Sequence, residues 1–112
     1  MPDLASGDGV AGVAALIGDP ARANILSALM SGRALTAGEL ARHARVTAQT
    51  TSGHLARLLE ARLIVVERQG RHRYFRLASP EVARATEALS VIAGVGPDRT
   101  LAIGPKDEAL RR

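Results

Sequence analysis

The stretch from Arg68 to Arg76 concentrates the side chains best suited to bind a polyanion. In this run, "RQGRHRYFR", four arginines and a histidine surround Tyr74 and Phe75, the only tyrosine and phenylalanine of the chain. Guanidinium groups pair with phosphate oxygens, and a tyrosine hydroxyl can donate a hydrogen bond to the same oxygens. We predict that this run contacts a nucleic-acid backbone through Arg68, Arg71, His72, Arg73 and Tyr74.

A second set of short polar side chains lies upstream, in "TAQTTSGHLAR". A helix is about as wide as the DNA major groove, so small polar residues near its N-terminus can reach base edges. We predict that a helix beginning here contacts DNA through Thr47, Ala48, Gln49, Thr50, Ser52, Gly53, His54 and Arg57.

The distribution of charge favours the same partner. The chain has a net charge of +4, but residues 33–76 hold nine arginines and three acids, whereas the remainder holds six basic and eight acidic residues. A positive middle between slightly negative ends is typical of a polyanion-binding surface. A G+C-rich genome can explain fourteen arginines against one lysine, but it does not explain their segregation.

These side chains need a scaffold, and the sequence predicts packed helices with one hairpin. At 112 residues and 46% apolar content, almost all of it aliphatic, the chain suits one small domain. We predict a flexible leader over residues 1–9, a DNA-binding and dimerisation domain over 10–94, and a tail or linker over 95–112. Capping residues and Gly or Pro breaks delimit the expected helices, over 10–18, 19–32, 36–44, 48–63 and 79–94.

Two β-prone runs, "LIVVERQ" and "RHRYFRL", are separated by a turn at Gly70 and predict a hairpin. Alternation places Phe75 and Leu77 on one face and Tyr74 on the other. We expect Phe75 to anchor the hairpin on the core together with Leu77 and a valine of the first strand. The stretch "RALT", residues 33–36, is either an extended link or a stub of strand.

This order of elements is that of a winged helix-turn-helix, with the hairpin as the wing. The chain resembles the ArsR/SmtB winged-helix repressors in "IGDPARANILSAL", in "LTAGELARHARVTAQTTSGHLARLLEARLIVVERQGRHRYFRL" and in the helix opened by "SPEV". The resemblance implies a mainly α fold of five helices and a two-stranded wing. It also implies a homodimer on a palindromic operator, with DNA-facing roles for Gln49, Thr50, Ser52, His54, Arg71 and Arg73.

The first and last helices are the expected dimer interface. The resemblance implies this arrangement, and both helices have apolar faces that a monomer would leave partly exposed, which soluble domains avoid. The residues that we expect there are Val13, Leu16, Val82, Ala85, Leu89 and Ile92.

The chain departs from the family in two places: the helix expected to contact DNA, over 48–63, and the residues with which many family members bind a metal signal. Ala48 and Gly53 are shorter than the polar residues usual at their positions, so contacts to base edges should be few and DNA shape should contribute more. The chain has no cysteine, and its histidines (His43, His54 and His72) lie in separate elements. We therefore predict no metal site and no cofactor in this chain.

Effector sensing is expected to come from elsewhere. Either the chain is a truncated form, or a metal-binding partner protein, with nickel or zinc as its ion, supplies the signal. The resemblance extends to a nickel-linked actinomycete member of the family.

Other classes of function are less consistent with the sequence. It has no Gly-rich phosphate loop and no spacing that suggests a nucleophile, a base and an orienting acid, so we predict that it is not an enzyme. It has no apolar run of membrane-spanning length and no basic signal-like start, so we expect a cytoplasmic protein. The alternative that stays open is a winged-helix interaction module whose basic face binds an acidic partner protein.

Overall fold

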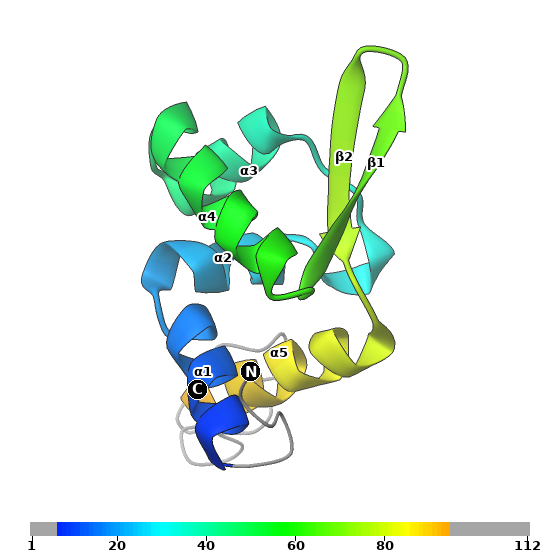
Figure 1. Ribbon diagram of the computed structural model, residues 1–112. Helices are drawn as coiled ribbons and strands as arrows, with labels where there is room; N and C mark the ends of the chain where they lie inside the picture. The colour runs from blue at the N-terminus through cyan, green and yellow to red at the C-terminus, as the bar shows by residue number, and fades with distance from the viewer. Residues whose placement is uncertain (1–6, 95–112) are drawn as a thin grey trace, which may run out of the picture.

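The computed structural model describes residues 7–94, and within them the chain forms five α-helices and one β-hairpin (Figure 1). The predicted winged helix-turn-helix order is confirmed. The elements are α1 (Gly7–Ile17), α2 (Pro20–Ala28), the 3-10 turn η1 (Met30–Gly32), α3 (Ala37–Ala44), α4 (Ala48–Glu60), β1 (Ile64–Gln69), β2 (His72–Leu77) and α5 (Pro80–Ala93).

Side chains cap four of the helices at the places that the sequence indicates. The Asp19 carboxylate accepts a hydrogen bond from the Arg22 backbone N–H at 3.0 Å, and the Thr47 and Ser79 hydroxyls cap α4 and α5 in the same way. Thr36 and Glu39 form a reciprocal capping box at the start of α3. Each cap satisfies end amides that have no partner within the helix, and so fixes where the helix begins.

Three helix boundaries differ from the prediction. Helix α1 begins at Gly7, three residues earlier than expected, so part of the predicted leader is helical. Helix α2 ends at Ala28 rather than at Gly32, because the backbone turns left-handed at Ser31 (φ 68°) and Gly32 (φ 74°). Helix α4 ends at Glu60 rather than at residue 63, because the backbone turns left-handed at Arg62 (φ 63°). Residues 1–6 of the predicted leader and the predicted tail, 95–112, lie outside the described residues.

The hairpin is held to the core at its base. Gly70 and Arg71 form its two-residue turn, where Gly70 takes a positive φ of 62° that suits glycine. Leu35 extends the sheet: its N–H and carbonyl bond with the carbonyl and N–H of Phe75, at 3.0 and 2.8 Å. Of the two alternatives for residues 33–36, the structure therefore shows the stub of strand.

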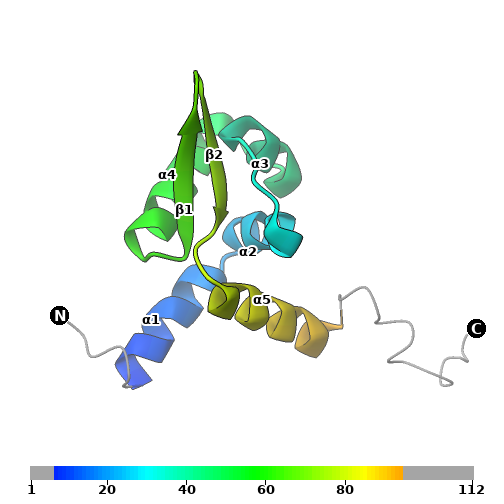
Figure 2. The same ribbon diagram turned by 90° about the vertical axis from the view of Figure 1, so that its right-hand side faces the viewer.

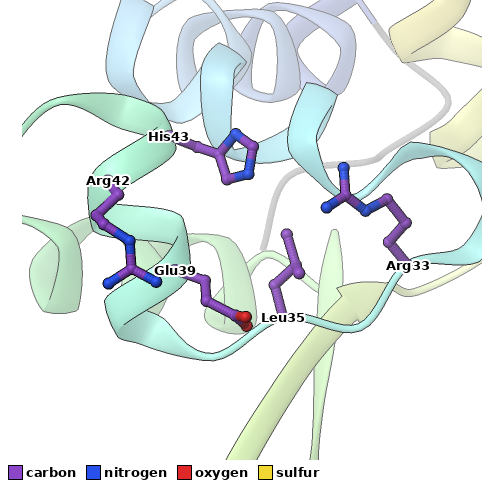
Figure 3. A pocket seen from close by; sticks show the side chains of 5 residues that line it. All are labelled: Arg33, Leu35, Glu39, Arg42 and His43. Carbon is purple, nitrogen blue, oxygen red and sulfur yellow. The ribbon is translucent and has the colours of Figure 1, made fainter.

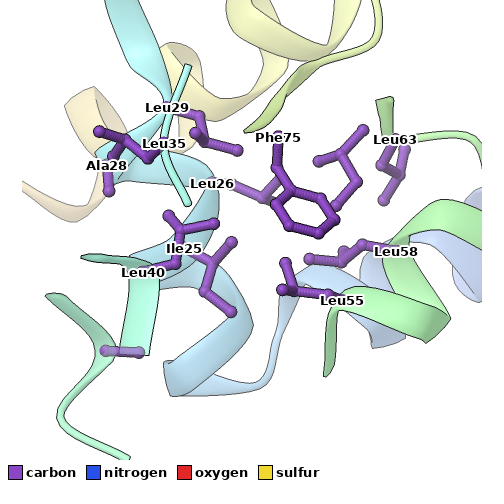
Figure 4. Packing of buried hydrophobic residues seen from close by; sticks show 12 residues of the cluster. Ile25, Leu26, Ala28, Leu29, Leu35, Leu40, Leu55, Leu58, Leu63 and Phe75 are labelled. Carbon is purple, nitrogen blue, oxygen red and sulfur yellow. The ribbon is translucent and has the colours of Figure 1, made fainter. Parts of the chain in front are cut away.

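The core is an aliphatic cluster around a single aromatic ring, drawn from α2, α3, α4 and the hairpin (Figure 4). Phe75 is 2% exposed, as the anchoring role requires. Val66 lies opposite Phe75 in the hairpin register, but the prediction that a valine of this strand helps to anchor the hairpin in the core is wrong. Val65 and Val66 are 36% and 39% exposed, and the buried residue of β1 is Ile64. The buried cluster consists of Ile25, Leu26, Ala28, Leu29, Leu35, Leu40, Ala44, Leu55, Leu58, Leu63, Ile64 and Phe75.

The elements separate into two ends. Helices α3 and α4 and the hairpin project to one side of α2, while α1 and α5 lie on the other side, away from the hairpin tip (Figures 1 and 2). The positively charged elements therefore form one end of the domain, and the two helices expected at the dimer interface form the other.

Candidate nucleic-acid interface

Helix α4 turns one face to the core and its first turns to solvent. Thr51, Leu55 and Leu58 are buried and hold the helix in place. The predicted DNA-contacting residues on the opposite face are exposed, namely Thr47, Ala48, Gln49, Thr50, Ser52, Gly53 and Arg57.

The first turn of α4 keeps one hydroxyl proton available for an outside acceptor. The Thr47 hydroxyl accepts from the Thr50 N–H at 3.0 Å and donates its own proton to the Thr50 hydroxyl oxygen at 2.9 Å. Since Thr50 accepts in this pair, its own proton is free to point outward. A hydroxyl held in this way can donate to a phosphate oxygen or to a base acceptor.

His54 lies differently from the other residues predicted to contact DNA. Its side chain is 16% exposed and turns toward the start of α2, where Nδ1 lies 3.1 Å from Arg22 Nη1 and Nε2 lies 3.8 Å from the Asp19 carboxylate. A guanidinium only donates, so Nδ1 accepts and the ring proton sits on Nε2. His54 thus joins α4 to α2, and we leave it out of the DNA-contacting set.

Arg22 extends this junction to a third helix. Its Nε donates to the Leu16 carbonyl at the end of α1, at 2.6 Å. The backbone N–H of Arg22, together with its guanidinium charge, holds the pKa of Asp19 below its ordinary value, so this carboxylate stays ionised. Sequence reasoning missed this three-helix junction, although the "DPAR" stretch held its signal: a charged residue at the cap and another three residues later.

The wing presents its basic residues on both faces and at its tip. Arg68, Arg71, His72 and Arg73 are exposed, and Tyr74 is half-buried. The Arg73 guanidinium carbon lies 5.4 Å from the centre of the Phe75 ring, and on the other face the rings of His72 and Tyr74 are 6.1 Å apart. Phe75 therefore both anchors the wing and steadies one of its cations.

A groove of about 370 Å³ lies between the wing and α4. Ser52 and Ala56 of α4 line one wall, and Arg71, His72 and Arg73 line the other. The polar tip of α4 and the arginines of the wing therefore share one side of the molecule. This arrangement can place the helix against base edges while the wing contacts phosphates.

At the opposite end, α1 and α5 carry exposed apolar side chains. Leu89 and Ile92 are 47% and 82% exposed, whereas Leu16 and Val82 are half-buried against the core of their own chain. An apolar groove of about 500 Å³ runs between α1, α2 and α5. Val10 and Val91, at 65% and 63% exposed, belong to the same pair of helices and were not predicted.

Two further findings concern residues 7–94 only. No three His, Cys, Asp or Glu side chains among them cluster in a way that could hold a metal ion. None of the helices in this part of the chain is both long enough and apolar enough to span a membrane.

The comparisons with known proteins agree with this geometry. A helix-turn-helix domain family matches residues 17–67, from the end of α1 through most of β1. The HTH-type transcriptional regulator CmtR of Mycobacterium tuberculosis is 36% identical over 84 residues, which are 74% of this chain and 70% of CmtR. This chain belongs to the HTH-type transcriptional regulators. The regulator YdfF of Bacillus subtilis is 51% identical over 84 residues, but the match spans only 37% of YdfF.

Solved structures of this class have the same fold. The homodimeric winged helix-turn-helix DNA-binding domain of Mb0332 from Mycobacterium bovis, described as a possible ArsR-family regulator, has a TM-score of 0.68 and 29% identity, covering 77% of this chain and 79% of that one. NolR from Sinorhizobium fredii has a TM-score of 0.69 and 26% identity, covering 86% of this chain and 100% of NolR. The description of Mb0332 supports the ArsR/SmtB family that the sequence suggests.

Proposed function

We propose that this HTH-type regulator binds double-stranded DNA sequence-specifically, as a homodimer on a palindromic operator. The observation that carries the proposal is the shared face of the α4 tip and the wing, with Ser52 and Arg71 lining one groove. Helix α4 enters the major groove, and the wing follows the adjacent backbone.

The contacts divide by chemistry. The wing residues Arg68, Arg71, His72, Arg73 and Tyr74, together with Arg57 of α4, contact phosphates and position the domain without reading sequence. Gln49, Thr50 and Ser52 carry the exposed polar groups near the N-terminus of α4 that can donate to base edges. Ala48 and Gly53 offer no polar group, so the shape of the duplex carries part of the specificity.

The dimer forms through α1 and α5. Their exposed valine, leucine and isoleucine side chains offer an apolar surface that a second copy can cover, around Val13, Ala85, Leu89 and Ile92 with Leu16 and Val82 at its edge. The Mb0332 domain, which has the same fold and is homodimeric, supports the formation of a dimer. A twofold axis through this end directs two α4 helices to two half-sites, which is why the operator is expected to be a palindrome.

The decisive experiment measures DNA affinity by fluorescence anisotropy. A palindromic duplex from the promoter region of the gene should bind more tightly than a shuffled duplex, and both affinities should fall log-linearly with salt. Replacing both Arg71 and Arg73 with Ala should weaken binding to both duplexes and leave their ratio largely unchanged. Equal affinity for the two duplexes at moderate salt would contradict the proposal and favour the acidic protein partner instead.

The signal that releases DNA is a separate proposal. We infer that a partner or a further domain supplies effector sensing, with nickel or zinc as the candidate ion. The described residues contain no cluster of ligands, which supports sensing outside residues 7–94. A pull-down from cells grown with and without added nickel, followed by metal analysis of the captured complex, tests this idea. Capture of the protein alone and without metal would contradict it.

A further inference from the structure

Several basic residues of the positive stretch 33–76 lie outside the proposed DNA-binding surface, which consists of the first turns of α4 and the wing. We call that surface the helix-and-wing surface. Arg33 follows η1, and Arg42 and His43 lie on α3; all three are exposed. They belong to the positive middle of the chain, but not to the groove between α4 and the wing. The fold gathers them around a separate hollow on another side of α3.

This hollow has a volume of about 290 Å³ and is lined by Arg33, Leu35, Glu39, Arg42 and His43. In Figure 3 the side chains of Arg33 and His43 point toward one another across it, from the loop and from α3. Pockets that enclose a whole drug-sized molecule usually measure about 300–1,000 Å³. The size therefore suits a single anionic group better than a complete small molecule.

Neither the Arg33 nor the Arg42 guanidinium forms an ion pair within the described part of the chain. Among residues 7–94, no carboxylate lies within the 4.0 Å of an ion pair from Arg33 or Arg42, whereas Arg76 and Arg84 each have such a partner. Two unpaired guanidinium groups beside a hollow attract an anion, and their planar forks match phosphate oxygens.

The one acid in the lining is already engaged. Glu39 Oε1 accepts from the Thr36 N–H at 2.9 Å and from the Thr36 hydroxyl at 3.2 Å, in the capping box of α3. These bonds, with added attraction from Arg42 and Arg33, hold the pKa of Glu39 below its ordinary value. Even with Glu39 ionised, the two arginines leave the lining positive.

We propose that this hollow binds a phosphate group, as a site distinct from the helix-and-wing surface. Two sources share this chemistry, a backbone phosphate of the bound duplex and a free phosphate or phosphate ester. A duplex bound in the groove would lie near the hollow, because only the first turn of α3 separates the two sites. Thr36, Ala37 and Gly38 line the groove, and Glu39, Arg42 and His43 line the hollow. The first helix of a helix-turn-helix also crosses the DNA backbone.

The first arm of the test titrates the full 112-residue chain with inorganic phosphate in the absence of DNA. Titration followed by ¹H–¹⁵N NMR should give saturable shifts at the Arg33 side chain and at the amides of 35–43. Arg33→Gln should abolish these shifts. Arg84→Gln, which removes the same charge from an exposed site on α5, should retain them. This arm does not depend on the proposed function, so it stands even if the protein shows no preference for an operator.

The second arm measures the salt dependence of duplex binding for the same two variants. If the hollow receives a backbone phosphate, Arg33→Gln should reduce the slope of log affinity against log salt by about 0.9, the value of one phosphate contact. Arg84→Gln should leave the slope unchanged. Shifts in the first arm with equal slopes in the second assign the site to a free phosphate. The proposal is overturned if Arg33→Gln matches Arg84→Gln in both arms.

Discussion

The junction of Arg22, His54 and Asp19 makes Arg22→Met a sharp test of how α4 is held in place. Methionine keeps the unbranched aliphatic stem but removes every guanidinium contact. Two hydrogen bonds are lost, one to the Leu16 carbonyl at 2.6 Å and one to His54 Nδ1 at 3.1 Å. A hydrogen bond that involves a charged group contributes about 1.5–3 kcal/mol, and partial exposure places each of these at or below the lower end.

We therefore expect Arg22→Met to lower the free energy of unfolding by about 2 kcal/mol. For a domain of this size, that loss corresponds to a fall of about 8–16 °C in Tm. The assay is urea unfolding followed by circular dichroism, with all variants at one protein concentration because the proposed dimerisation would make apparent stability depend on concentration. The matched control is Arg84→Met, whose exposed ion pair with Glu81 at 3.0 Å is worth at most about 1 kcal/mol.

A double-mutant cycle separates the His54 contact from the rest. Arg22→Met, His54→Ala and the double variant should give a coupling free energy of about 1 kcal/mol, since the two side chains are in direct contact. Arg22→Met should also weaken operator binding, because α4 is no longer fixed to α1 and α2. Strict additivity, or an Arg22→Met variant as stable as Arg84→Met, would refute the proposed role of this junction.

Three other predictions concern single positions and have independent readouts. Thr51→Val should raise the unfolding free energy by about 1 kcal/mol in urea titrations, because the Thr51 hydroxyl is buried and has no hydrogen-bond partner among residues 7–94. Gly53→Ala should stabilise the domain by a similar amount, about 1 kcal/mol, since the position is helical and nothing lies within 4 Å of an added Cβ; an unchanged Tm would contradict this. The folded-state pKa values of Asp19 and Glu39 are lowered from ordinary values of 3.8 and 4.5, so their stabilisation is present above those values and lost as the pH falls below them. The free energy of unfolding, measured from pH 6 to pH 2, should stay level until the pH approaches these ordinary values and should then decline. Glu39→Gln should make the decline smaller.

The features that sequence alone predicted are those fixed by nearby residues. Asp19, Thr36, Thr47 and Ser79 each accept from an amide three residues later, so a cap can be recognised from four consecutive letters. The buried leucines of α4 likewise follow from helical spacing, and Gly70 marks the hairpin turn. Local chemistry was sufficient in each case.

The features that sequence missed depend on partners far along the chain. His54 was expected on the DNA face, but its partner Arg22 lies 32 residues away and draws the imidazole inward. Three consecutive apolar residues open β1, and alternation alone could not tell that Ile64 would be buried and the two valines exposed. The early end of α2 depends on the left-handed backbone at Ser31, and a serine in the sequence does not indicate that conformation. The hollow beside Arg33 is also invisible until the loop and α3 are brought together.

The pair of hydrogen bonds between Leu35 and Phe75 has a mechanical consequence. It gives β2 a hydrogen-bonded partner on both of its edges at Phe75, with Leu35 on one side and β1 on the other. The pairs nearer the tip, from Glu67 opposite Tyr74 to Gln69 opposite His72, are held only by the bonds between β1 and β2. We therefore expect the tip of the hairpin to bend more easily than its root, so that the wing can follow the backbone of the proposed DNA partner while the core stays packed. Amide exchange should reveal this gradient, slow at the clamp and fast toward the tip.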